Sequence, residues 1–311
     1  MYIKQVFKVE NDWWLYLIGV IITGIAAIIG SIPHSIAIFY YAFSDGKDIS
    51  SMNDPYELMS LIDSNLNLFL MLLSFAVGLL ALFFVIKFIH KQTITSLTTS
   101  RKKVDWNRFW FSFTLWGFVT VLFIGIEYLS SPNNFVFNFE LVPFLILFLI
   151  AVIMVPLQTS FEEYLFRGYL MQGIGILAKN RWLPLFLTSI AFGLLHIANP
   201  EIEKLGNILL IHYIGTGFLL GIMTLMDEGL ELALGFHAAN NLVASLLMTA
   251  DWTAFQTNSI LKDISDPTMG NLEIILPVFV VYPILLYVLS LKYNWTNWRD
   301  KLFGPVNNDL K

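Results

Sequence analysis

Five polar side chains lie inside hydrophobic stretches of this sequence: Glu162, Glu163, His196, His237 and Asn241. An ionisable group in a membrane-crossing stretch is costly, so it indicates a functional site when it has a partner. Carboxylates and imidazoles exchange protons, and a carboxamide donates hydrogen bonds without bringing a charge. These residue types therefore indicate proton-transfer chemistry, provided that the three segments that carry them meet.

The composition predicts the elements that must position these residues. Of the 311 residues 57% are hydrophobic and 13% charged, and the mean hydropathy is +0.68, far above that of a soluble domain. A membrane-crossing helix needs about 20 mostly apolar residues. The sequence predicts an all-α, polytopic integral membrane protein with about eight transmembrane helices, at about 14–43, 66–89, 109–129, 141–177, 182–198, 205–226, 230–249 and 272–291.

The basic residues predict the orientation of these helices. With the N-terminus in the cytoplasm, fourteen Lys and Arg fall on the cytoplasmic side, and only Lys47, Lys204 and Lys262 fall outside. The positive-inside rule thus favours cytoplasmic N- and C-termini. The first apolar run is too long for a signal peptide, so we interpret it as a retained anchor. The expected location is a bacterial cytoplasmic (inner) membrane. The cytoplasmic set comprises Lys4, Lys8, Lys87, Lys91, Arg101, Lys102, Lys103, Arg108, Lys179, Arg181, Lys292, Arg299, Lys301 and Lys311.

Two further features of the composition exclude classes of chemistry and of partner. The chain has no cysteine, which excludes disulfides, thiolate nucleophiles and thiolate metal ligands. The net charge is −5 and no basic stripe is present, so a nucleic-acid partner is not expected.

The segment from Phe161 to Gly168 carries Glu162, Glu163 and Arg167. On a helix, Glu163 and Arg167 are four residues apart and can form an ion pair. Glu162 projects about 100° away from Glu163, which leaves it free for another role. The alternative interpretation is a helix end that emerges into the cytoplasm, with all three side chains simply solvated.

The histidines lie on two other segments. His196 comes late in an apolar stretch, where a lone histidine is more often a hydrogen-bonded structural residue. His237 and Asn241 share one helical face with only alanines beside them, which leaves room for a ligand. Gly217 and Gly221 form a small-residue face that favours close helix packing. We interpret His212, on that same stretch, as structural.

Depth in the membrane tests whether the three segments can meet. At 1.5 Å per residue, His237 and Asn241 lie roughly 10–16 Å from the cytoplasmic start of their stretch, and His196 lies roughly 21 Å from Trp182. Glu162 reaches a comparable depth only if its helix continues past Arg167 towards about Leu177. On this model the residues converge roughly 10–20 Å below the cytoplasmic surface.

Three motifs now stand in order: EExxxR from Glu162 to Arg167, FxxxH from Phe192 to His196, and HxxxN from His237 to Asn241. Together they resemble the CPBP (Abi) family of intramembrane proteases, which includes CAAX-processing endopeptidases and bacteriocin-processing or self-immunity proteins. The resemblance implies a catalytic core over residues 141–250. On this division, residues 1–140 form N-terminal transmembrane helices without a recognisable motif. Residues 251–311 form an extracytoplasmic loop, the last transmembrane helix and a cytoplasmic tail.

The resemblance implies an intramembrane endopeptidase that acts on a membrane-associated protein or peptide. It implies that Glu162 and His196 activate water, and that His237 and Asn241 stabilise the oxyanion or help to bind the activating centre. Peptide hydrolysis does need a base for water, a donor to the oxyanion and a proton for the leaving amine. Glu163 and Arg167 would be a supporting pair.

These residues leave open whether the site uses a metal ion. Glu162, His196 and His237 make a two-histidine, one-glutamate set of the type that catalytic zinc uses. No HxxxH pair places two ligands on one helix, however, and the family has been described both as metal-dependent and as a glutamate protease. Metal-free water activation is preferred, with zinc as the alternative.

Two other classes of function compete with proteolysis. A non-proteolytic membrane scaffold or immunity protein of the same fold would carry the polar cluster as structure only. A transporter would show inverted repeats with paired broken helices, and this sequence shows no such internal similarity. The substrate, and whether it is prenylated, cannot be inferred from the sequence.

Overall fold

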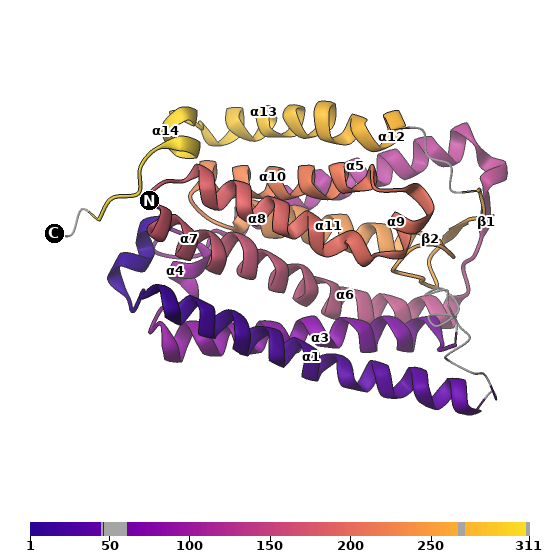
Figure 1. The fold of residues 1–311 in the computed structure, drawn as a ribbon. Coiled ribbons are helices and arrows are strands. Elements are labelled where there is room, and N and C mark those ends of the chain that lie inside the picture. Colours follow the sequence, from indigo (N-terminus) through magenta and orange to yellow (C-terminus); the bar gives the residue numbers. More distant parts are fainter. Residues whose placement is uncertain (45, 47–60, 267–270, 309–311) are drawn as a thin grey trace.

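The computed structural model describes residues 1–44, 46, 61–266 and 271–308 as a bundle of roughly aligned helices (Figure 1). Six described helical segments are long and apolar enough to cross a membrane, at Trp13–Ser44, Ser64–Ile89, Trp106–Ser130, Leu141–Ala178, Leu209–Asp227 and Ile274–Tyr293. The predicted class, an all-α polytopic membrane protein, is confirmed. Its partner is accordingly the lipid bilayer.

Two of the eight predicted stretches form shorter helices. One is Trp182–Ala198, and the other is a 17-residue helix at Glu231–Leu247. The second packs against three other helices of the bundle and buries eleven of its side chains, so its neighbours replace much of the lipid around it. The count of eight spans therefore stays a prediction.

The main helices are joined by short elements, several of them 3-10 or π turns. In chain order they are η1 (Ile3–Lys8), α1 (Trp13–Ser44), α3 (Ser64–Phe84), η3 (Val85–Ile89), α4 (Ile94–Thr98), α5 (Trp106–Ser130), η4 (Pro132–Asn134), β1 (Phe135–Phe137), α6 (Leu141–Glu163), η5 (Tyr164–Leu170), α7 (Met171–Ala178), α8 (Trp182–Leu194), η6 (Leu195–Ala198), α9 (Pro200–Leu205), α10 (Leu209–Asp227), α11 (Glu231–Leu247), β2 (Met248–Ala250), β3 (Leu261–Asp263), α12 (Asn271–Leu276), η7 (Pro277–Val281), α13 (Tyr282–Tyr293) and α14 (Trp298–Phe303).

Side-chain caps define where several helices begin. Asp63 accepts hydrogen bonds from the backbone N–H groups of Asn65 and Leu66 at the start of α3, and Asp105 accepts one from Asn107 at the start of α5. Such caps satisfy N–H groups that the helix itself leaves unpaired. Between the caps the helices are apolar on most sides, and large side chains such as Phe43 and Leu129 face outwards, as lipid contact requires.

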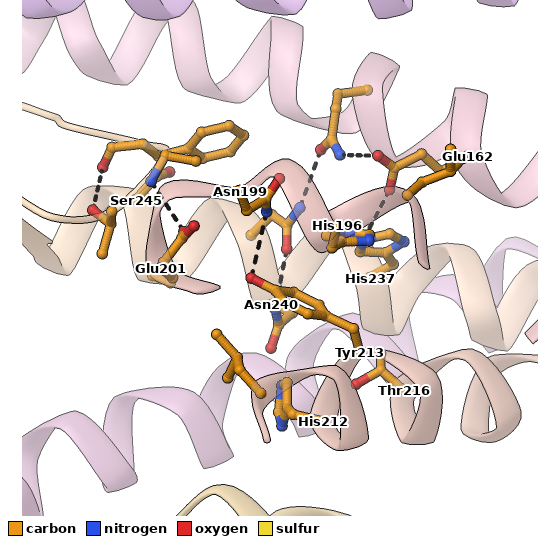
Figure 2. A pocket seen from close by; sticks show the side chains of 18 of the residues that line it. Glu162, His196, Asn199, Glu201, His212, Tyr213, Thr216, His237, Asn240 and Ser245 are labelled. Carbon is orange, nitrogen blue, oxygen red and sulfur yellow. Dashed lines mark hydrogen bonds and ion pairs between the residues drawn. The ribbon is translucent and has the colours of Figure 1, made fainter. Parts of the chain in front are cut away.

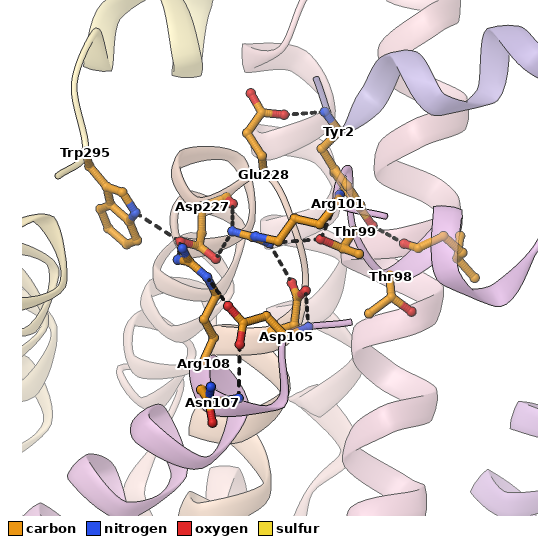
Figure 3. A network of polar contacts seen from close by, with 12 residues as sticks. Tyr2, Thr98, Thr99, Arg101, Asp105, Asn107, Arg108, Asp227, Glu228 and Trp295 are labelled. Atoms are coloured by element: carbon orange, nitrogen blue, oxygen red, sulfur yellow. Dashed lines mark hydrogen bonds and ion pairs between the residues drawn. The ribbon is translucent and has the colours of Figure 1, made fainter. Parts of the chain in front are cut away.

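The two ends of the bundle differ in charge. At the end that carries η1, α4 and α14 (Figure 1), Arg101 and Arg108 both pair with Asp227 (Figure 3). Lys301 pairs with Glu228 at the same end, and we call it the basic end. Glu228 contacts both the backbone N–H of Tyr2 and Lys301, so the N-terminal segment and α14 lie at the same end. That both termini face the cytoplasm stays a prediction.

The opposite end carries a small sheet, which the sequence did not predict, and we call it the strand end. Its order is β1-β3-β2, with β1 antiparallel and β2 parallel to β3. Lys262 of β3 lies opposite both Val136 and Thr249. Each strand has only three residues, too few to show the alternation that predicts a strand.

Helices α8 and α10 approach closely through glycine. A Cβ atom at Gly217 would lie only 2.6 Å from the backbone oxygen of Ser189, and one at Gly193 only 2.3 Å from the side chain of Ile214. The predicted close-packing role of Gly217 is thus present, and it brings the end of α8, with Phe192, and the following turn η6, with His196, against α10.

Candidate active site

Glu162 and Glu163 are the last two residues of α6, and the helix continues without a break. A π-helical turn, η5, follows directly, and α7 extends the apolar segment to Ala178, as the depth argument required. One-turn π segments inside α-helices are frequent at functional sites. Here the turn begins immediately after the two glutamates.

Arg167 forms a buried ion pair with Glu163. The side chains of both residues are 0% exposed, and Arg167 Nη1 donates to Glu163 Oε1 at 2.9 Å. Arg167 Nη2 donates to the Gly217 carbonyl at 3.2 Å, and its guanidinium lies 4.2 Å from the centre of the Phe192 ring. The alternative of a solvated helix end is therefore wrong, because this pair joins three helices in the interior.

His237 lies between the two glutamates. Its Nδ1 donates to Glu163 Oε1 at 2.8 Å, and its Nε2 is 3.4 Å from Glu162 Oε2 (Figure 2). A carboxylate oxygen accepts the hydrogen bond from Nδ1–H, and this contact directs Nε2 of the ring towards Glu162. The structure thus brings the EExxxR and HxxxN segments into direct contact.

Gln158 connects Glu162 to Asn241, and the sequence analysis did not single it out. Gln158 Nε2 donates to Glu162 Oε1 at 2.8 Å, and its Oε1 accepts from Asn241 Nδ2 at 3.1 Å. The available signal was its spacing, since Gln158 is a polar residue in an apolar run one helical turn before Glu162.

Asn240 and Trp116 extend this chain of hydrogen bonds. Asn240 Nδ2 donates to Asn241 Oδ1 at 3.0 Å, and Trp116 Nε1 donates to Asn240 Oδ1 at 2.9 Å. The amide orientation of Asn241 is therefore fixed on both sides. Only one Asn241 N–H is used, so the second remains able to donate to a ligand.

His196 lies in η6, just after α8, and does not hydrogen bond to Glu162. Its Nδ1 donates to the Phe192 carbonyl at 2.8 Å, and its ring stacks on Tyr213 with 4.2 Å between ring centroids. The Phe192 ring contacts His196 at 4.8 Å and His237 at 5.9 Å between centroids. The expected pair of Glu162 with His196 is thus replaced by Glu162 with His237, while both histidines flank one aromatic ring.

A cavity of about 760 Å³ joins these residues. It is lined by all four predicted catalytic residues, Glu162, His196, His237 and Asn241, and mainly by apolar side chains elsewhere (Figure 2). His212, which we interpreted as structural, also lines it. Glu162 is 9% exposed, and its Oε2 has no hydrogen-bond partner among the described residues. A buried acceptor without a donor is costly, so the site favours a ligand that donates to it.

The alternative zinc set of Glu162, His196 and His237 does not form. Among the described residues, no group of three or more His, Asp or Glu lies close enough to hold a metal ion. Glu162 Oε2 and His237 Nε2 are adjacent, whereas His196 is held against Tyr213 and the Phe192 carbonyl. Two adjacent donor atoms do not fit the three-ligand site that catalytic zinc uses.

Replacement of Gln158 tests whether its hydrogen bonds fix the orientation of Glu162 and Asn241. We expect Gln158→Leu to lower kcat about 10- to 100-fold at nearly unchanged abundance, because Glu162 and Asn241 both lose a partner that fixes their orientation. Gln172→Leu is the matched control, since Gln172 is buried on the same helical segment but bonds Gln92. Equal losses of turnover in the two variants would contradict a positioning role for Gln158.

Comparison with known proteins gives two matches. Residues 140–243 match a family model described as type II CAAX prenyl endopeptidase, Rce1-like. An uncharacterized protein of Bacillus subtilis (strain 168), YyaK, is 30% identical over 244 residues, which cover 77% of this chain and 79% of YyaK. No significant match was found among solved structures. With the three motifs gathered around one cavity and the Rce1-like match over their segment, the chain belongs to the CPBP family.

Proposed function

We propose that this protein is an intramembrane endopeptidase that hydrolyses a peptide bond in a membrane-associated protein or peptide. Family membership supports peptidase activity in general. The observation that carries the specific proposal is the 3.4 Å approach of Glu162 Oε2 to His237 Nε2 at the wall of a 760 Å³ cavity inside an apolar bundle. A base and a hydrogen-bonding partner facing one space are what water activation needs.

Glu162 acts as the general base in this proposal. Water that occupies the cavity donates a proton to Glu162 Oε2, and its oxygen bonds to the carbonyl carbon of the scissile peptide. The Nε2 atom of His196 orients the water, since its Nδ1–H is held by the Phe192 carbonyl. The carbonyl double bond becomes a single bond, and the negative charge moves to its oxygen.

His237 and Asn241 stabilise that oxyanion. Asn241 uses its second N–H, and the protonated form of His237, which Glu163 stabilises from 2.8 Å, donates from Nε2. Donors of this kind act strongly where water is excluded. When the C–N bond breaks, the proton held by Glu162 passes to the leaving nitrogen, which yields a carboxylic acid and an amine.

The cavity and the relatives of this chain support a proposal for the substrate class and for the membrane. A largely apolar cavity fits an apolar peptide segment of a membrane-associated protein. The relative in Bacillus subtilis favours a bacterial cytoplasmic membrane as the location. The three-part division at residues 140 and 250 stays a prediction, and the Rce1-like match at 140–243 supports its central part.

Comparative analysis of membrane-protein termini tests the proposal. Cells that produce the wild type should contain new protein termini that are absent from cells with Glu162→Gln at equal protein abundance. Identical sets of termini would contradict proteolysis. They would favour the second candidate, a non-proteolytic scaffold or immunity protein of this fold, for which the substitution should also leave phenotype and partner co-purification unchanged.

The donor arrangement predicts a metal-independent reaction. Dialysis of the purified protein against a strong zinc chelator should leave turnover unchanged, because the described residues supply only two adjacent donor atoms. Elemental analysis of the same sample provides the control. Stoichiometric zinc together with turnover that falls on chelation and returns with added zinc would overturn the metal-free mechanism.

A further inference from the structure

The charge of the cavity wall is strongly one-sided. Its described lining includes four carboxylates, on Glu127, Glu162, Glu201 and Asp263, and no Lys or Arg. In an apolar surrounding such charges act over longer distances than in water. The wall therefore attracts cationic groups, and it repels a carboxylate such as the free C-terminus of a protein.

The cavity extends from the predicted catalytic residues towards the strand end. Along α11 its lining runs from His237 to Ser245, which is about 12 Å at helical rise, and it continues to Thr249 in β2. It then includes Thr253 in the loop after β2 and Asp263 in β3. Three of the four carboxylates, all except Glu162, line this outer part.

The basic end, by contrast, is held together by hydrogen bonds and ion pairs. Arg101 donates to Asp227 Oδ2 at 2.9 Å and to Glu231 Oε2 at 3.1 Å, and Asp227 also accepts from Trp295 Nε1 at 3.2 Å (Figure 3). Tyr2 is 1% exposed and donates to the Leu97 carbonyl at 2.6 Å. These contacts tie η1, α4, α10 and α11 together, and none of the residues that make them lines the cavity.

Two carboxylates of the outer cavity carry charge that no described cation neutralises. Glu201 Oε1 accepts from the backbone N–H of Ala254 at 3.0 Å, while its Oε2 is buried without a hydrogen-bond partner. Asp263 Oδ1 accepts from the backbone N–H of Ser265 at 2.8 Å. Neither side chain has an ion pair within the described residues, so an incoming cation would gain their full attraction.

We propose that the cavity admits a peptide segment from the strand end, and that Glu201 and Asp263 bind a cationic group of this segment in the outer part of the cavity. This rests on the proposed peptidase function and names its substrate class. The group is a Lys or Arg side chain or a free amino terminus, and a free C-terminal carboxylate is disfavoured. In the orientation that the positive-inside rule predicts, the strand end lies outside the cytoplasm, so the proposed substrate is extracytoplasmic.

Binding to the inactive Glu162→Gln variant tests the charge preference without relying on cleavage. The variant is placed in zwitterionic lipid nanodiscs and titrated with three labelled apolar peptides of about 20 residues, flanked by two Lys, two Gln or two Glu. We expect the Lys peptide to bind at least about tenfold more tightly than the Glu peptide. Added Glu201→Gln and Asp263→Asn substitutions should remove most of the difference.

Glu203→Gln is the matched control, because Glu203 is exposed on the same short helix and does not line the cavity. Equal affinities for the Lys and Glu peptides, or a preference unchanged by the paired substitutions, would overturn the proposal. Selective binding without cleavage by the wild type would instead contradict the peptidase function alone. Cleavage without charge preference would contradict this inference alone.

The side of entry is tested separately, with single cysteines in a chain that has none. Asp251→Cys lies at the strand end, where the native side chain is 78% exposed, and Lys103→Cys lies at an exposed position of the basic end. A membrane-impermeant maleimide should label Asp251→Cys in intact cells, and Lys103→Cys only after permeabilisation. The reverse pattern would overturn the extracytoplasmic assignment.

Discussion

Glu162→Gln should lower kcat about 100- to 10 000-fold, the usual contribution of a general base. Glutamine keeps the volume of the side chain and can still hydrogen bond to Gln158, so the fold and substrate affinity should change little. The amide cannot take a proton from water, and the chemical step is therefore lost. Steady-state turnover of a reconstituted substrate, together with thermal unfolding of the same preparations, measures both quantities.

A matched substitution separates loss of the base from general damage to the site. Glu127→Gln removes a carboxylate from the outer part of the same cavity, away from the hydrogen bonds around Glu162. It should keep kcat within a few-fold of the wild type. If Glu162→Gln retained comparable turnover, the assignment of the general base would be wrong.

Arg167→Met should destabilise the protein by about 3–5 kcal/mol, because it leaves the buried Glu163 carboxylate without its cation. The loss includes the hydrogen bond to the Gly217 carbonyl and the contact with the Phe192 ring. Equilibrium unfolding in detergent, followed by tryptophan fluorescence, gives the free energy. Arg167→Lys should recover only part of it, since an ammonium group cannot reproduce the planar two-nitrogen contact.

Two controls make this result specific to the pair. The double substitution Glu163→Gln, Arg167→Met removes both charges and should regain most of the stability that the single substitution loses. Arg299→Met, at an exposed position of α14, should change the free energy of unfolding by about 0.5 kcal/mol or less. If Arg299→Met cost as much as Arg167→Met, the buried pair would not be the cause.

The sequence predicts well the features that depend on local geometry. Apolar stretches become helices because the backbone must satisfy its own hydrogen bonds in lipid. The Glu163–Arg167 pair follows from four-residue spacing on one helix, and the structure has it at 2.9 Å. The small-residue face at Gly217 likewise predicts a close helix contact, which α8 provides.

Contacts between segments are harder to predict, since nothing in local spacing specifies which face meets which. The position of His237 between Glu162 and Glu163, and the chain from Trp116 through Asn240 to Gln158, arise only when α5, α6 and α11 pack together. The stacking of His196 on Tyr213 is of the same kind. For this reason the sequence predicted which residues meet around one cavity better than it predicted how they pair.

The most direct measurement is mass spectrometry of a membrane peptide substrate incubated in water labelled with heavy oxygen. With the wild type we predict one heavy oxygen atom in the carboxylate of the new C-terminus, and no such product with Glu162→Gln. Absence of a labelled product from the wild type, or equal product from both proteins, would contradict hydrolysis by water that Glu162 activates.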